Sequence, residues 1–291
     1  FGSSLRGRDD PPGILVMGDT EEGSSAPSIP NDTFKPFSFS VEQLAESVSE
    51  ASVTFNTHGL LHIQGILSEA VVDALHARIE SELALRREDA NAEAWFGDVY
   101  GFEEKGFRWD MKLTRSPAVR DALVSVIQVI KALLESRKPS WQLAELAAMC
   151  TFPGDPGQPV HADTSHIYDE QVVTIFVALH DIDITRGPTK MYPGSHVDGE
   201  LHMGYRKPDE DAAVYCTMRK GDCAVMDSRL LHCGTANRSG LHRFLFYSSW
   251  RPPVRRPRGS TNTILGRYED KFYLNKWQEW AGEVDDDLQL V

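Results

Sequence analysis

An almost unbroken run of β-branched and apolar residues, QVVTIFVALHDI at 171–182, constrains the fold more than any other feature of the sequence. A strand with one face in water alternates apolar and polar residues, whereas a run of this kind is typical of a strand covered on both faces. The protein must therefore place a layer of structure on each side of this strand. Four further strand-like segments can join it in a sheet, at 146–152, 213–218, 222–230 and 242–250.

Helical patterns precede the strand-like half of the chain and predict the layer that covers the sheet. We expect a short helix at 41–52, a longer one after Ser68 and another at Ser116-Pro117, where proline at the first helical position loses no hydrogen bond. The apolar faces of the two longer helices are Val71, Leu75, Ile79 and Leu83, and Val119, Leu123, Val126, Ile127, Ile130 and Leu134. Helices followed by strands predict an α+β protein, with the helices packed on a curved β sandwich or barrel.

Composition and charge narrow the class of protein. The chain has 291 residues, of which 41% are hydrophobic, and this is enough for one large domain, expected at 34–280. The formal net charge is −13, and much of it lies in a Gly/Pro/Ser-rich lead at 1–33, expected to be disordered, and in an acidic tail at 281–291. This balance leaves no basic surface to follow a phosphate backbone, so nucleic acid is not an expected partner. The absence of an apolar run of about 18 residues excludes a membrane span.

The four cysteines indicate the cellular compartment. Cys150, Cys216, Cys223 and Cys233 form no CxxC pair and lie in apolar stretches, so we expect buried, reduced thiols rather than a disulfide framework. The start of the chain has no signal-peptide pattern, although it begins with Phe1 rather than Met. An intracellular, cytoplasmic protein is therefore expected.

The tripeptide His161-Ala162-Asp163 is the first candidate for a metal site. In an extended chain its two outer side chains point to the same side, about 6.6 Å apart along the backbone. His232, directly after the strand-like segment that ends at Leu230 and Leu231, can supply a third ligand. Two imidazoles and one carboxylate are the ligands of non-haem Fe(II) oxygenases, but zinc also accepts them. The residues alone therefore predict a metal site and leave iron and zinc open.

Arg243 lies inside the apolar segment 242–250, where a buried charge is costly unless it meets an anion. Its planar guanidinium fits a carboxylate in two parallel hydrogen bonds, each worth about 1.5–3 kcal/mol when charge-assisted. A dicarboxylate cosubstrate that chelates the metal and reaches Arg243 explains both features. Pairing with a structural aspartate is the alternative explanation.

Four segments carry a resemblance to a known family. They are HGLLHIQGILSEAVVDALHARI (58–79), Gln158-x-x-His161-x-Asp163, GPTKMYPGSH (187–196) and DSRLLHCGTANRSGLHR (227–243). The chain resembles the phytanoyl-CoA dioxygenase family of Fe(II)/2-oxoglutarate oxygenases over about residues 55–250. The resemblance implies a double-stranded β-helix (a jelly-roll, cupin-like core) with the metal ligands at its open mouth and the N-terminal helices on one face.

The resemblance also implies roles for individual residues. The implied iron ligands are His161, Asp163 and His232. Arg243 is implied to bind the distal carboxylate of 2-oxoglutarate, and Gln158 and Thr189 to hydrogen-bond this cosubstrate. Because family members that halogenate usually lack the carboxylate that Asp163 retains, hydroxylation, desaturation or another oxidation is the expected outcome.

Other positions bear on substrate binding. Arg186 stands where the family usually has asparagine before its Gly-Pro-Thr, so a nearby loop is expected to make different contacts. Candidate substrate contacts are His166, Tyr168, Trp109 and Asp110. The alternatives are an exposed loop for the first two and core packing for the last two, which precede the helix expected at Ser116-Pro117.

The sequence is thus interpreted as an Fe(II)- and 2-oxoglutarate-dependent dioxygenase that uses O₂ to oxidise a small organic substrate, with ascorbate as a candidate reductant. Two other functions stay open: a catalytically silent module that binds metal or 2-oxoglutarate, and a zinc hydrolase on a cupin-like barrel. The substrates of the family range from acyl-CoA thioesters to amino-acid derivatives and polycyclic natural products, and the fold does not select among them. Nothing in the sequence specifies the oligomeric state.

Overall fold

The computed structural model describes residues 34–87, 96–97, 107–113, 115–138, 140–164, 172–253 and 271–281. These residues all belong to one compact unit of the chain, Asn31–Val291. The lead expected at 1–33 lies outside the described residues, as does the tail expected at 281–291 apart from its first residue. No helix in the described part of the chain is long and apolar enough to cross a membrane.

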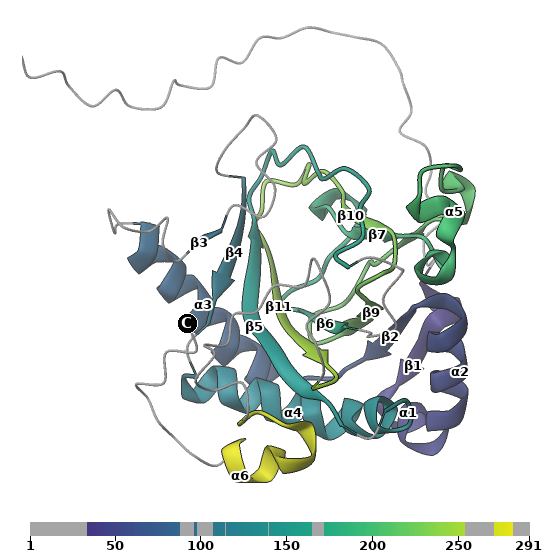
Figure 1. The fold of residues 1–291 in the computed structure, drawn as a ribbon. Coiled ribbons are helices and arrows are strands. Elements are labelled where there is room, and N and C mark those ends of the chain that lie inside the picture. The colour runs from purple at the N-terminus through teal and green to yellow at the C-terminus, as the bar shows by residue number, and fades with distance from the viewer. Residues whose placement is uncertain are drawn as a thin grey trace, which may run out of the picture. The chain divides into compact units, whose positions relative to one another are not determined.

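The four N-terminal helices are interspersed with short strands, and most of the longer strands follow them, as expected (Figure 1). The helices are α1 (Val41–Glu46), α2 (Val48–His58), α3 (Glu69–Arg87), α4 (Pro117–Glu135), α5 (Gly199–His202) and α6 (Trp277–Ala281). The strands are β1 (Ser38–Ser40), β2 (Leu60–Gln64), β3 (Phe96–Gly97), β4 (Arg108–Lys112), β5 (Gln142–Thr151), β6 (Val173–Ala178), β7 (Thr189–Met191), β8 (Val214–Tyr215), β9 (Cys223–Asp227), β10 (His232–Gly234) and β11 (Arg243–Arg251). Short 3-10 helices are η1 (Lys35–Phe37), η3 (Ile184–Arg186), η4 (Ser195–Val197), η5 (Glu210–Ala212) and η7 (Leu274–Lys276).

Eight strands form the larger sheet, in the order β1-β2-β9-β6-β11-β5-β4-β3. All neighbours are antiparallel except β1 and β2. The strand predicted at 171–182 is β6, in the interior of this sheet. Its Val173, Ile175 and Val177 belong to the core on one face, and Ala178 belongs to the core on the other, so β6 is covered on both faces as its sequence predicts.

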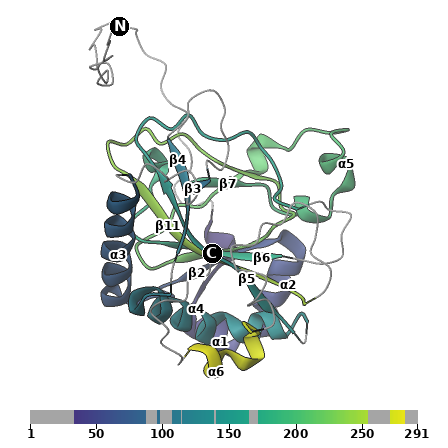
Figure 2. The same cartoon turned by 60° about the vertical axis from the view of Figure 1, so that its left-hand side comes forward.

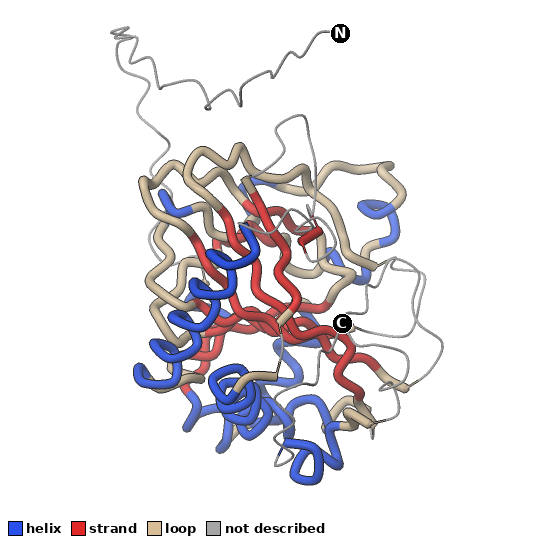
Figure 3. The backbone as a smooth tube through the Cα atoms, turned by 90° about the vertical axis from the view of Figure 1, so that its left-hand side faces the viewer, coloured by secondary structure: helices blue, strands red, loops and turns tan. Residues whose placement is uncertain are grey.

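Helices cover one face of the larger sheet (Figures 2 and 3). Helix α4 starts after Ser116, whose backbone is extended, and has Pro117 in its first turn. Its predicted apolar residues are all buried against the sheet, as are Ala122 and Leu133. Each fully buried aliphatic side chain of this kind contributes about 1.5–3 kcal/mol, so this face anchors the sheet.

The segment predicted as one helix at 41–52 forms two helices. Ser40 caps α1 in a capping box with Gln43, and the chain leaves helical geometry at Ser47 before α2 runs on to His58. Gly59 then ends α2 with φ 76°, and a Cβ there would lie 2.7 Å from His196 Nδ1. The positive φ and this close approach together require glycine.

A smaller antiparallel sheet, in the order β10-β7-β8, packs against the other face of the larger sheet. The core between the sheets includes Met191 and Val214 from the smaller sheet and Met226 and Leu245 from the larger one. The Gly-Pro and Pro-Gly dipeptides at 186–196 are typical of a loop, but three residues of this segment form β7. The prediction missed this strand because three residues are too few to show an alternating pattern.

Candidate metal centre

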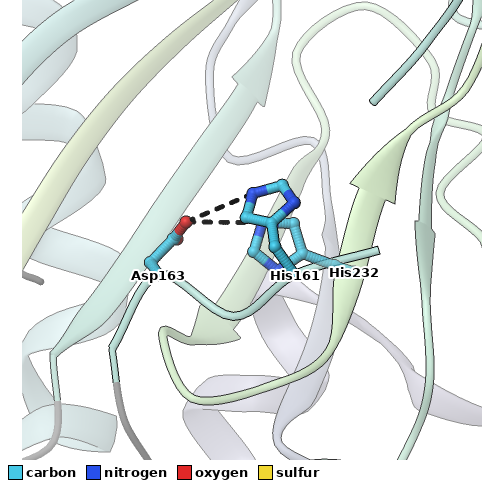
Figure 4. Close-up of side chains that lie close together, drawn as sticks. All are labelled: His161, Asp163 and His232. Carbon is cyan, nitrogen blue, oxygen red and sulfur yellow. Dashed lines mark ion pairs between the residues drawn. The ribbon is translucent and has the colours of Figure 1, made fainter. Parts of the chain in front are cut away.

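The three predicted metal ligands lie together beside the start of β10 in the smaller sheet (Figure 4). Asp163 Oδ1 is 3.6 Å from His161 Nε2 and 3.7 Å from His232 Nε2. One ligand atom from each residue lies within 4.8 Å of the other two, which is the separation that a shared metal ion requires. No other group of this kind occurs in the part of the chain that the structure describes.

Backbone pairing brings the two histidines side by side. His161 donates its N–H to the His232 carbonyl at 2.9 Å and accepts the His232 N–H at 2.8 Å. His232 begins β10, which pairs with β7 through the opposition of His232 and Met191. Residues 71 positions apart in the chain are thus held in direct register, which the sequence spacing alone does not show.

A backbone carbonyl two residues earlier in the chain orients each imidazole ring. His161 Nδ1 lies 2.9 Å from the Pro159 carbonyl oxygen, and His232 Nδ1 lies 2.9 Å from the Leu230 carbonyl oxygen. A carbonyl oxygen only accepts, so each Nδ1 carries the proton and each Nε2 presents a lone pair. Hydrogen bonds of this type fix the tautomer of metal-binding histidines, and both Nε2 atoms here face Asp163.

Electrostatics favour the neutral histidine that a metal needs. Burial lowers the pKa of His161, and the adjacent His232 ring lowers it further. The Asp163 side chain is 40% exposed, so the centre has an open side. The donor set fits Fe(II) and equally fits zinc, and the surrounding residues must discriminate between them.

Arg243 is the most completely buried arginine among the described residues, with 1% of its surface exposed. Its Nη2 donates to Thr151 Oγ1 at 3.0 Å, and its Nη1 donates to the Gly187 carbonyl. Its Nε has no hydrogen-bond partner among the described residues. No described carboxylate bonds to it, so the structural aspartate considered from the sequence is not what holds Arg243.

A second buried guanidinium, Arg108 on β4, was missed from the sequence. Arg108 donates to Asp155 from Nε at 3.1 Å and from Nη2 at 3.0 Å, while Nη1 has no partner among the described residues. It is close enough to lower the pKa of both His161 and Arg243, although burial is the larger cause in each. Asp155 thus bonds to Arg108 and acts on Arg243 through its charge, so one described carboxylate serves two buried guanidinium groups.

Comparison with known proteins identifies the family. The family model for phytanoyl-CoA dioxygenase (PhyH) matches residues 55–244. The chain belongs to the PhyH family. The resemblance stated from the sequence is confirmed, and the matched segment contains both histidines, Asp163 and both buried arginines.

Curated relatives of this PhyH protein are dioxygenases by name. Dioxygenase peniF of Penicillium patulum is 31% identical over 156 residues, which are 48% of this chain and 46% of that protein. Dioxygenase FrzG of a Cladobotryum species is 25% identical over 217 residues, 66% of this chain and 69% of that protein. The match to dioxygenase andF of Emericella variicolor covers 37% of that protein, so the chain spans half or less of the length of two of these relatives.

Solved structures confirm the fold of this PhyH domain. AviO1 from Streptomyces viridochromogenes Tue57 has a TM-score of 0.58 and 21% identity, covering 72% of this chain and 96% of that one. The 2-oxoglutarate-dependent epimerase SnoN from nogalamycin biosynthesis has a TM-score of 0.56 and 18% identity, covering 71% of this chain and 83% of that one. The predicted α+β, double-stranded β-helix architecture is therefore confirmed.

Gln158 and Thr189, which the resemblance assigns to the cosubstrate, lie on either side of Gly234. Gln158 Oε1 accepts the Gly234 N–H at 2.9 Å, and Thr189 is the register partner of Gly234 between β7 and β10. A Cβ on Gly234 would lie 2.2 Å from Arg108 Nη1, so the glycine that contacts both residues adjoins the second guanidinium. Their roles toward a cosubstrate stay predictions.

Arg186, which replaces the family's usual asparagine, links the segment after β6 to the segment before β11 by hydrogen bonds. Its Nε and Nη2 donate to the His242 carbonyl at 2.9 and 2.6 Å, and its Nη1 donates to the Asp181 carbonyl at 3.2 Å. His242 directly precedes Arg243, so Arg186 fixes the start of β11. Arg186 thus acts on the loop that follows β6 and not on the metal ligands.

The structure describes two of the four candidate substrate residues. His166 and Tyr168 lie outside the described residues. Trp109 packs against the helix-covered core and meets the Phe152 ring edge-on at 6.4 Å, so the structure does not bring it to the metal ligands. Asp110, the next residue of β4, points to the opposite, inner face of the sheet.

The cysteine prediction is confirmed for the four thiols, all of which are buried and free. Burial raises the pKa of the Cys150 thiol well above its ordinary value, and the Asp110 charge adds to this effect. Such thiols are inert packing groups, so they supply no ligand to the centre.

Proposed function

We propose that this PhyH protein is a non-haem Fe(II)- and 2-oxoglutarate-dependent dioxygenase that oxidises, by hydroxylation, a small organic substrate. His161, Asp163 and His232 hold the iron in this proposal. The arrangement that carries the proposal is the pair of buried guanidinium groups beside these ligands, Arg243 and Arg108, each with an N–H that lacks a partner among the described residues. A zinc hydrolase needs neither arginine.

The two arginines fit the two ends of a dicarboxylate. Arg108 is close enough to the metal ligands to lower the pKa of His161, so it suits the carboxylate nearer the metal. Arg243, at the start of β11, suits the distal carboxylate. An anion with two negative charges compensates these two cations, for which Asp155 is the one acidic partner among the described residues, and charge-assisted hydrogen bonds of this kind contribute about 1.5–3 kcal/mol each.

Iron, when bound by this triad, supplies the redox chemistry that couples 2-oxoglutarate decarboxylation by O₂ to oxidation of a C–H bond. The protein's own residues orient the reagents. The Pro159 and Leu230 carbonyls hold the histidine rings, and Asp155 holds the Arg108 guanidinium. Names of relatives support this proposal, since peniF and FrzG are called dioxygenases and a solved SnoN complex contains Fe³⁺ and 2-oxoglutarate. Ascorbate is proposed as the reductant that keeps the iron ferrous.

Anaerobic titration of the purified protein with Fe(II) and 2-oxoglutarate tests this function. A weak visible charge-transfer band is expected, and O₂ with ascorbate should then yield succinate. The His232→Ala variant is the control, because it removes one ligand and should abolish both signals while circular dichroism reports on folding. A folded, iron-loaded protein with no band and no succinate contradicts the dioxygenase and favours the silent module. Hydrolytic activity with Zn(II) in the absence of O₂ favours the zinc hydrolase.

A further inference from the structure

A second polar pair lies on the inner face of the larger sheet and has no part in binding metal or 2-oxoglutarate as proposed above. Tyr247 on β11 places its hydroxyl 2.8 Å from Asp110 Oδ1 and 2.9 Å from Asp110 Oδ2. The two side chains meet across β5, because Asp110 is the register partner of Met149 and Tyr247 is the register partner of Ala147. The small Ala147 side chain leaves room for the phenol to reach the carboxylate.

The Tyr247 side chain is firmly held. Its ring packs against the Phe176 ring of β6, with centroids 5.6 Å apart, and 6% of the residue is exposed. Asp110 is less buried than Tyr247 and lies with Met149 and Phe176 among the partly exposed residues of the inner face. The pair therefore presents a carboxylate, at a fixed position, on a wall that is otherwise partly apolar.

This wall continues the face that carries the cosubstrate arginines. Arg108 and Asp110 are two residues apart on β4, and Arg243 and Tyr247 are four apart on β11, so all four side chains point inward. The pKa of Asp110 is raised to about 6, chiefly by burial and to a smaller extent by the Asp163 charge, while the Tyr247 hydrogen bond and the Lys112 charge act in the opposite direction. Asp163 also raises the pKa of Tyr247, behind burial and the nearer Asp110 and Glu145 charges, so the pair lies within electrostatic range of the candidate metal ligand.

The pair has unused capacity to accept hydrogen bonds. An ionised carboxylate has about four acceptor positions, and one tyrosine hydroxyl supplies a single proton. Tyr247 is the hydrogen-bond donor that the described residues provide to Asp110; Lys112, on the same face, acts on it through charge alone. A phenylalanine at 247 and an apolar residue at 110 fill the same space without burying a charge, so packing does not account for the pair.

We propose that Asp110 and Tyr247 form a specificity site, which accepts a hydrogen bond from a hydroxyl or ammonium group of the substrate and so positions the substrate beside the metal. This inference rests on the proposed dioxygenase function. Its ligand class is an apolar skeleton that carries one N–H or O–H donor, because Met149 and Phe176 line the same wall.

The test uses three probes with one skeleton: decalin-2-ol, decalin-2-amine and 2-methoxydecalin. Each is titrated by calorimetry into full-length protein loaded with Mn(II) and 2-oxoglutarate. The alcohol and the amine should bind about ten- to a hundredfold more tightly than the ether, which accepts but cannot donate. A preference for the amine over the alcohol indicates that charge dominates, and the reverse indicates a neutral donor.

The variants are Asp110→Asn, which keeps the size and removes the charge, and Tyr247→Phe, which keeps the ring packing. Both should lose the preference for donor-bearing probes while affinity for 2-oxoglutarate stays at the wild-type value. Matched controls are Asp121→Asn on the exposed face of α4 and Tyr273→Phe beside η7, which should retain the preference.

The possible outcomes separate the two proposals. Equal binding of all three probes to the wild type, or binding of none up to their solubility limits, overturns the specificity site. So does a wild-type preference in either test variant. Loss of 2-oxoglutarate affinity in the test variants places the pair in the cosubstrate site and also overturns it. A wild-type protein that binds no 2-oxoglutarate refutes the proposed function itself.

Discussion

Gly234 lies against the Arg108 guanidinium, and replacing it by alanine should displace the arginine. A Cβ at this position would lie 2.2 Å from Nη1, 2.6 Å from Nη2 and 2.7 Å from Cζ of Arg108. Ordinary contact begins near 3.4 Å, so the guanidinium must retreat by about 1 Å. Its bonds to Asp155, at 3.0 and 3.1 Å, would then stretch to about 4 Å and cease to be hydrogen bonds.

Two costs set the size of the effect. Overpacking a buried site costs about 1–3 kcal/mol, and full loss of a buried ion pair costs about 3–5 kcal/mol. The overpacking cost of about 1–3 kcal/mol corresponds to a fall in Tm of about 2–12 °C for a domain of this size. If Arg108 binds a cosubstrate carboxylate, the affinity for 2-oxoglutarate should also fall by about ten- to a hundredfold, because a charge-assisted hydrogen bond is lost.

The assay is a thermal melt together with 2-oxoglutarate binding to the Mn(II)-loaded protein. Gly240→Ala is the matched control, because Gly240 lies in the segment that joins β10 to β11 and a Cβ there meets nothing within 4 Å. Affinity for Mn(II) should be equal in both variants. If Gly234→Ala melts and binds 2-oxoglutarate as Gly240→Ala does, Arg108 is not held at Gly234 and the reasoning fails.

Two further predictions concern buried charges. Arg243→Ala should raise the KM for 2-oxoglutarate by about two to three and a half decades, the equivalent of about 3–5 kcal/mol, with Fe(II) affinity unchanged. Arg243→Lys should restore the KM in part, because lysine keeps the charge but not the planar fork. Steady-state kinetics measure both effects, and a wild-type KM in Arg243→Ala contradicts the role of Arg243 in binding 2-oxoglutarate. Burial opposes ionisation of Asp222, but hydrogen bonds from His62 and from the Gly65 and Arg219 N–H groups hold its pKa below the ordinary value. The ionised Asp222 therefore stabilises the fold above the unfolded pKa of about 3.9, and this stabilisation is lost as the pH falls through the folded pKa. Asp222→Asn should lower Tm at pH 7 and flatten the acid side of the plot of Tm against pH, as measured by thermal melts.

The sequence predicted the elements whose burial pattern is strong. Helix α4 and strand β6 were located because a stripe at helical spacing and a continuous apolar run are visible in one dimension. Strand β10 was missed and β4 was not recognised as a strand. The first has three residues, and the second, Arg108–Lys112, alternates charged residues with Trp109 and Met111.

The same alternation explains why the sequence did not show on which face of β4 the charged residues lie. In an ordinary strand the charged face is the solvent face, so RWDMK suggests an edge strand with Arg108 and Asp110 in water. The structure turns that face inward, where Arg108 meets Asp155 and Asp110 meets Tyr247. Only the long-range pairing of β4 with β5 decides the direction, and no local pattern contains it. By contrast, the spacing of His161 and Asp163 is local and was sufficient to identify them as a candidate pair.

Charge balance on the inner face leads to a last prediction, which does not depend on the metal. Asp155 bonds to Arg108 and acts on Arg243 through charge alone, and burial lowers the pKa of Arg243 because the charged form is poorly solvated. A dicarboxylate should therefore stabilise even the metal-free protein, and at a concentration of 100 times its dissociation constant the gain is about 2.7 kcal/mol, or a rise in Tm of about 5–10 °C. Levulinate has the same chain as 2-oxoglutarate but one carboxylate, so it can satisfy only one arginine and should raise Tm much less. Equal shifts with both acids in the presence of EDTA would show that the two guanidinium groups do not act as a pair.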